Sequence, residues 1–223
     1  DFDFSRATEA TRINSVGLIE TIGINLPRIN YEVGCGSWLF EPQSTNSVSQ
    51  SNLLNPVSGG VVTPNAAISP DGTTNAIKVN FSTGVNSGSL IYIGGSSATA
   101  STQYTFSFYA KNFLGDGKFR LRVDTNTQST LVNENFTATS EWVRYTHTFT
   151  TDAAASSFSS SSRFRKFTDN NEVLFFGMQL EQQSYATSYI PTSGSTVTRN
   201  QDVCTNGGSL ASINSTEGVL YAE

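Results

Sequence analysis

The chain has 223 residues, enough for one sizeable domain with flanking segments. Only 14% of the residues are charged and 37% are hydrophobic, and Ser, Thr, Asn and Gly fill the difference, which is typical of short strands and many turns. A net charge of −5 argues against nucleic acid or an anionic membrane as a partner, and no apolar run approaches the ~20 residues that insert across a bilayer.

Residues 1–48 are predicted to form an extended N-terminal arm, because their strand-like pieces are too short to bury a core alone. The arm contains Cys35, and Cys204 lies near the other end of the chain. Two cysteines define no disulfide framework, so a bridge between the two arms and two unpaired thiols both remain open.

Residues 49–191 are predicted to form an antiparallel β-sandwich, since strand candidates are spaced by turns and no amphipathic helix interrupts them. Residues 64–76, with a Pro-Asp-Gly turn, are predicted to be a loop. The strand candidates are 75–82, 88–94, 103–113, 117–125, 131–138, 142–151, 157–167 and 172–182. Eight strands in two sheets is the count of a jelly roll, so the predicted fold class is all-β, of jelly-roll type.

Alternation along these strands predicts which side chains face outward. If strands 103–111, 118–124 and 142–149 share one sheet, its outer face carries one aromatic ring and several cations. An aromatic ring stacks on the C–H face of a sugar, and Arg donates to hydroxyls or carboxylates. The predicted glycan-binding residues are Tyr109, Lys111, Arg120, Arg122 and Arg144, with Tyr92 as a second aromatic platform. The alternative is that these side chains only keep the face soluble.

Residues suited to catalysis or metal binding are scarce. The single histidine, His147, falls on the core-facing register, and Trp142 at a strand start is expected to pack at the rim. No zinc set, nucleophile elbow, P-loop or dinucleotide fingerprint is found, so we expect no enzyme and no cofactor. A Ca²⁺ ion remains open, with Asp71, Asp169 and Glu181 as its candidate ligands.

The segment 175–192 alternates as a strand and then leaves the sheet at Pro191, which has no backbone donor. Its sequence, GMQLE followed by SYATSYIPTSGSTVTR, resembles the end of a carbohydrate-binding-type jelly-roll module in bacteriophage tail and fibre proteins, especially of phages of marine Bacteroidetes. The same module occurs in some secreted glycan-active bacterial proteins. The N-terminal arm, with F.RAT.ATR.N, GLIE, PR..Y and LFEPQ, resembles the lead-in to that module.

Residues 192–223 are predicted to form a C-terminal arm. Residues 196–200 echo 10–14, and we expect the two segments to lie side by side. Residues 215–223 resemble the first strand of a laminin-G or concanavalin-like lectin domain, so a lectin-like domain is expected after them.

The resemblance implies a non-catalytic structural and adhesive protein of the virion, in a tail fibre or appendage, that binds host surface glycan weakly and through multiple copies. It implies a homo-oligomer, for which we expect a trimer, in contact with other virion proteins. One alternative is an accessory carbohydrate-binding module of a secreted polysaccharide-degrading enzyme, and the kind of domain C-terminal to Glu223 would distinguish the two. Another is an oligomeric scaffold that binds no sugar.

Overall fold

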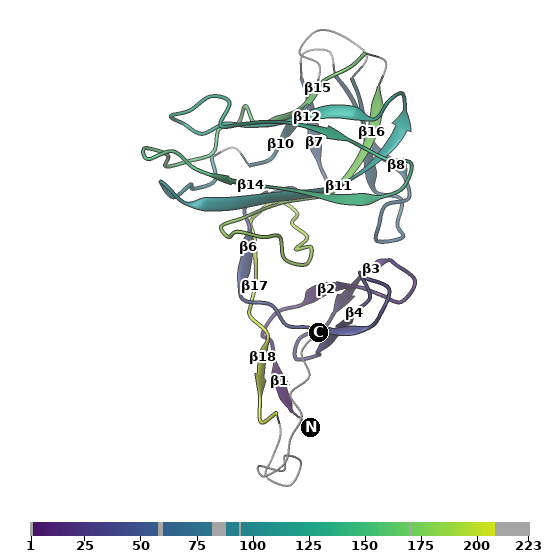
Figure 1. Ribbon diagram of the computed structural model, residues 1–223, viewed down its shortest axis with the longest axis vertical. Coiled ribbons are helices and arrows are strands. Elements are labelled where there is room, and N and C mark those ends of the chain that lie inside the picture. The colour runs from purple at the N-terminus through teal and green to yellow at the C-terminus, as the bar shows by residue number, and fades with distance from the viewer. Residues whose placement is uncertain (1, 58–59, 82–87, 94, 170, 208–223) are drawn as a thin grey trace.

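The computed structural model describes residues 2–57, 60–81, 88–93, 95–169 and 171–207. In these ranges the regular structure is β throughout, and no helix long and apolar enough to cross a membrane is found there. A sandwich of two sheets stands above a narrower region that contains β1 and β18 (Figure 1).

The sandwich consists of two five-stranded antiparallel sheets. The distal sheet, on the side away from the arm, has the order β13 (Val132–Thr137), β12 (Lys118–Val123), β15 (Arg163–Lys166), β10 (Gly88–Ile91) and β7 (Leu54–Val57). The arm-side sheet has the order β14 (Val143–Thr150), β11 (Gln103–Leu114), β16 (Glu172–Glu181), β9 (Ala76–Asn80) and β8 (Val61–Ala67). Because the chain crosses repeatedly between the sheets, as from β10 to β11 to β12, the predicted jelly-roll sandwich is confirmed.

Three local predictions need correction. β7 was not predicted, and the predicted loop 64–76 begins inside β8. Pro64 and Asn65 suggested a loop, but β8 is an edge strand whose register shifts between Thr63 and Ala67, which tolerates both residues. The predicted strand 157–167 begins only at Arg163, although Phe158 is buried in the core.

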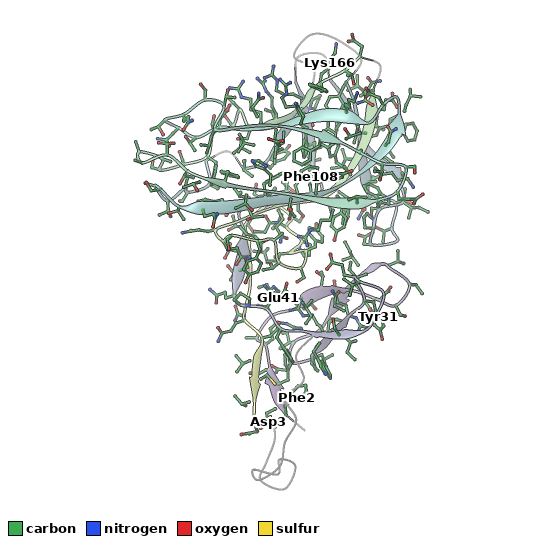
Figure 2. The ribbon with its side chains drawn as sticks, in the orientation of Figure 1. Phe2, Asp3, Tyr31, Glu41, Phe108 and Lys166 are labelled. Atoms are coloured by element: carbon green, nitrogen blue, oxygen red, sulfur yellow. The ribbon has the colours of Figure 1, made fainter. Side chains whose placement is uncertain are left out.

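The core between the sheets is dominated by phenylalanine. The ring centroid of Phe164 lies 4.2 Å from that of Phe175 and 4.9 Å from that of Phe108, so rings from β11, β15 and β16 interlock across the sandwich. Figure 2 shows Phe108 between the two layers. Each buried ring removes some 150–250 Å² from water, which explains how a chain with few long aliphatic side chains fills a sandwich core.

The two arms pair with each other below the sandwich (Figure 1). They form four two-stranded sheets: β1 (Asp3–Ser5) with β18 (Val203–Thr205), β2 (Ala10–Ile13) with β3 (Ile19–Ile22), β4 (Arg28–Asn30) with β5 (Ser37–Leu39), and β6 (Ser44–Asn46) with β17 (Val197–Arg199). The expected proximity of the arms is therefore confirmed. The partner of β17 is β6 rather than the predicted residues 10–14, although the Asn200 amide donates to Thr8 Oγ1.

A buried ion cluster joins the arms. Arg6 Nη1 donates to Asp202 Oδ1 at 2.8 Å, and Arg28 contacts both Asp202 and Glu41, while Arg199 Nη1 lies 3.4 Å from Glu41. Burial alone would raise the pKa of Asp202, but hydrogen bonds from Arg6 and the Glu41 amide and the charge of Arg28 outweigh it and hold the pKa below its usual value. Because every partner is nearly inaccessible to water, the cluster fixes one arrangement of the arms.

Candidate functional site: a cleft between the arm and the sandwich

The arm rests on the outer face of the arm-side sheet through a second, smaller apolar cluster. Ile19 of β3 packs with Tyr109 of β11, Phe176 of β16 and Tyr189, which lies C-terminal to β16. Gly177 allows this packing, because its φ of +64° suits glycine and an added Cβ would lie 3.3 Å from the rings of both tyrosines. The cluster fixes how far the arm stands from the sheet.

Beside this cluster lies an open cleft of about 450 Å³. Its walls come from three parts of the chain: the N-terminal arm, strands β11 and β14, and the segment that leaves β16. The residues most relevant to binding are Arg12, Asn30, Glu32, Tyr109, Arg144, Thr146 and Tyr185. This volume falls within the usual range for small-molecule sites.

Tyr109 and Arg144 form the floor of the cleft. They lie directly opposite each other on β11 and β14, and the guanidinium carbon of Arg144 is 5.6 Å from the centroid of the Tyr109 ring. Arg144 Nη2 donates to Ser107 Oγ at 2.9 Å, whereas its buried Nε has no acceptor within the residues that the structure describes. A guanidinium has five N–H groups, so most of this one's donors are left for an oxygen that enters the cleft.

Burial raises the pKa of Tyr109 and the nearby charge of Glu32 adds to this, while Arg144 acts in the opposite direction. Tyr109 therefore stays a neutral phenol that can donate a hydrogen bond at physiological pH. Its ring is only 9% exposed, so it does not serve as the open stacking platform that alternation predicted. The exposed ring at this cleft is Tyr185, with half of its surface accessible.

The predicted glycan-binding residues do not share one face. Tyr109, Lys111 and Arg144 lie on the arm-side sheet, but β12 belongs to the distal sheet, so the expectation that Arg120 and Arg122 lie beside them is wrong. Tyr92, just after β10, packs against the main core instead of standing free. Lys111 lies outside the cleft, with its Nζ 3.9 Å from Glu141 Oε2.

Other residues that the sequence singled out lie away from the cleft floor. Trp142 packs against the second cluster and donates to the Ile68 carbonyl, as expected of a rim residue. His147 is half-buried and stacks on Phe149. Cys35 and Cys204 are unpaired and exposed, which decides the open alternative in favour of two thiols.

The calcium candidates lie apart. Glu181 is fully buried and accepts from Ser44 and Thr187, Asp71 accepts from side chains of its own loop, and Asp169 contacts Lys166. Burial raises the pKa of Asp71, but hydrogen bonds from Ser69 and Thr73 outweigh it and hold the pKa below its usual value. Within the described part of the chain, no three His, Cys, Asp or Glu side chains gather as a metal site would require.

No protein-family model and no curated protein sequence matches this chain. Among solved structures, it is similar to the CBM22-1 and GH10 modules of Clostridium thermocellum xylanase 10B, complexed with xylohexaose (12% identity, TM-score 0.44). The similar region covers 68% of this chain but only 30% of that chain. It is also similar to the CBM22-1 xylan-binding domain of Paenibacillus barcinonensis Xyn10C (14% identity, TM-score 0.44, 64% of this chain and 94% of that one). A third is the C-terminal family 22 module of the C. thermocellum enzyme (9% identity, TM-score 0.45, 65% and 94%). Likeness at this level does not identify a ligand.

Proposed function

We propose that this chain is a non-catalytic glycan-binding module and that the cleft beside Tyr109 is its binding site. The observation that supports this most is the Arg144 guanidinium on the cleft floor, held over the Tyr109 ring with a buried donor that has no acceptor in the described residues. The Nη groups of Arg144 can donate to sugar oxygens, and hydrogen bonds from a charged group contribute about 1.5–3 kcal/mol each.

The rim completes a site suited to a sugar. Tyr185 offers an exposed ring for the C–H face, and Asn30, Glu32 and Thr146 offer polar groups for hydroxyls. This division of labour between one aromatic surface and a few placed polar groups is typical of small-molecule sites.

The carboxylates of this cleft favour binding over glycoside hydrolysis, because that reaction ordinarily needs two free carboxylates. Glu41 also lines the cleft, but its oxygens accept from Ser188 and contact Arg28 and Arg199. Glu32 is therefore the one cleft carboxylate, among the residues described, that is free of such an ion pair.

The test is a glycan array probed with the whole chain and three variants. Arg144→Gln should lower the affinity for the bound glycan about tenfold or more, since hydrogen bonds from charged groups contribute about 1.5–3 kcal/mol. Lys78→Gln removes one positive charge from the same sheet outside the cleft and should leave binding unchanged. Binding to uncharged glycans that survives Arg144→Gln and Tyr185→Ala together would contradict the proposal.

We further propose a place for the module in a bacteriophage tail fibre or similar virion appendage, as a homotrimer among other virion proteins. The support is the resemblance of the N-terminal arm and of the segment 177–199 to such proteins. Detection of the parent polypeptide by mass spectrometry in purified phage particles tests the location, and light scattering should give three times the 24.0 kDa chain mass. A secreted location, as the accessory module of a polysaccharide-degrading enzyme, is the alternative outcome.

A further inference from the structure

The outer face of the distal sheet carries a block of four arginines, here called the arginine face. In the register of β12 and β15, Arg120 lies opposite Arg165 and Arg122 lies opposite Arg163. Leu121 and Phe164, which alternate with them, are fully buried in the core, so all four guanidinium groups belong to the outer face. Neighbouring strands are about 4.8 Å apart and alternate residues about 6.6 Å apart, so the four side chains start from one small patch.

This block is costly for the fold. Like charges directly opposite each other on neighbouring strands destabilise a sheet. Burial lowers the pKa of Arg165, and the charges of Arg163, Arg122 and Arg120 lower it further. Four of the thirteen Lys and Arg residues thus meet on one face of a chain whose net charge is −5.

Few protein groups within the described residues balance these charges. Asp124 accepts two hydrogen bonds from Arg122 Nε, at 2.8 and 2.9 Å. Arg120 Nε donates to the neutral Asn135 at 2.8 Å, and its guanidinium lies 5.2 Å from the Phe167 ring centroid. Arg163 makes no ion pair in this part of the chain, and its buried Nε has no acceptor there. Arg120 and Arg163, which have no ion pair among the described residues, therefore keep positive charge and donors for a ligand.

The border of the face is polar. On β13, Asn133 and Asn135 are exposed and lie opposite Arg122 and Arg120. At the other border, Asn55 of β7 is exposed and lies opposite Leu90 of β10. A protein partner would have to present a matching set of acidic side chains at the centre of its interface, where charged residues are depleted. Nucleic acid is disfavoured by the acidic character of the whole chain. A polyanion rich in hydroxyl groups matches both the charged centre and the amide border.

We propose that the arginine face binds an acidic polysaccharide through its carboxylate or sulfate groups. Each guanidinium can donate two parallel N–H bonds to such an oxyanion, and four of them in one patch favour a chain with closely spaced anionic groups over a single small anion. The face lies on the opposite side of the sandwich from the cleft; Figure 2 shows Lys166, the last residue of β15, on the far side from Glu41 and Tyr31 in the arm.

The test uses the whole chain and measures affinity, at 0.15 M salt, for dextran sulfate, polygalacturonate, uncharged dextran and poly-L-glutamate. The double variant Arg163→Gln/Arg165→Gln should lower affinity for the bound acidic polysaccharide about 100-fold, or about tenfold for each guanidinium. Arg120→Gln provides a second variant, because the Arg120 Nε hydrogen bond is exposed whereas the Arg163 Nε is buried. Thermal unfolding of each variant confirms that the fold is retained.

Binding to dextran sulfate or polygalacturonate, but not to dextran, that is lost in the double variant and kept in Lys78→Gln supports the proposal. Loss for dextran sulfate alone identifies sulfate as the recognised group, and loss for polygalacturonate alone identifies carboxylate. Equal affinity for poly-L-glutamate would point to an acidic polypeptide instead, and equal loss in Lys78→Gln would show only diffuse attraction; either result overturns it. Arg144→Gln should leave this binding intact, so the proposals for the cleft and for the arginine face can be tested separately.

Discussion

At the scale of single residues, arginines occupy three distinct environments in this chain. Arg144 is held on a cleft floor, four arginines crowd the distal sheet, and three more lie inside the arm. The same side chain has opposite consequences in these places. Inside the arm Arg6, Arg28 and Arg199 each lie beside a carboxylate, whereas Arg144 and Arg163 have no ion pair among the described residues.

Asp202→Asn should destabilise the protein by about 3–5 kcal/mol, because it leaves Arg6 and Arg28 buried beside a neutral group. Urea denaturation at pH 7 measures this loss. Asp169→Asn is the control, since its ion pair with Lys166 is largely exposed on the Asp169 side and should contribute about 0–1 kcal/mol. Equal losses in the two variants would show that the buried cluster has no special weight.

The same carboxylate makes stability depend on pH. The pKa of Asp202 is lower in the folded chain than in the unfolded one, so its contribution is complete above the unfolded value of about 3.9 and is lost as the pH falls through the folded value. The difference in unfolding free energy between wild type and Asp202→Asn should therefore be constant from pH 7 to pH 5 and shrink below pH 4. A difference that grows on acidification would reverse the sign of this assignment.

Cys35 and Cys204 should both react with a thiol reagent in the native state, because both are exposed and unpaired. A colorimetric thiol assay without denaturant should give two thiols per chain. One or no reactive thiol would mean that the bridge between the arms forms after all.

At the scale of secondary-structure elements, alternation predicted the faces of the strands but not which sheet each strand joins. The core-facing sides of β11 and β12 are as expected, since side-chain direction is local. The other side of β11 was expected to be open, but Thr105, Ser107 and Tyr109 are buried there. The separation of Arg120 from Tyr109 depends on strand pairing between distant parts of the chain, which local pattern does not encode. The burial of Tyr109 depends on contacts with Ile19 and Tyr189, which are distant in the sequence. The position of Arg163 opposite Arg122 likewise depends on the pairing of β15 with β12.

Gly177 tests how the arm is seated on β16. Gly177→Ala should cost about 1–2 kcal/mol for its left-handed backbone and at least ~1 kcal/mol more for displacing the Tyr109 and Tyr189 rings. Gly17→Ala is matched in φ, at +83°, but has open space around it, so only the first cost applies. Chemical denaturation of both variants gives the comparison, and equal losses would argue against close packing of the two rings on Gly177.

At the scale of the whole molecule, the arms and the sandwich form one unit. The cluster around Tyr109 and the hydrogen bonds from Ser188 to Glu41 and from Asn46 to the Met178 carbonyl all cross between them. The cleft is built from both parts, so its shape depends on their staying together.

We therefore expect a single cooperative unfolding transition for the arm and the sandwich. Native-state hydrogen exchange should show the Ala110 and Phe175 amides, in the sandwich, losing protection in Asp202→Asn by the same free energy as the arm amides. Two separate transitions, with the sandwich unaffected by the substitution, would mean that the arm is an independent unit.

The most direct measurement of the proposed binding site is a crystal structure of this chain with the uncharged oligosaccharide that gives the strongest array signal. We predict the sugar in the cleft, with its ring against Tyr185 and its oxygens accepting from Arg144. An oligosaccharide bound elsewhere, with the cleft empty and Arg144 unchanged, would contradict this prediction.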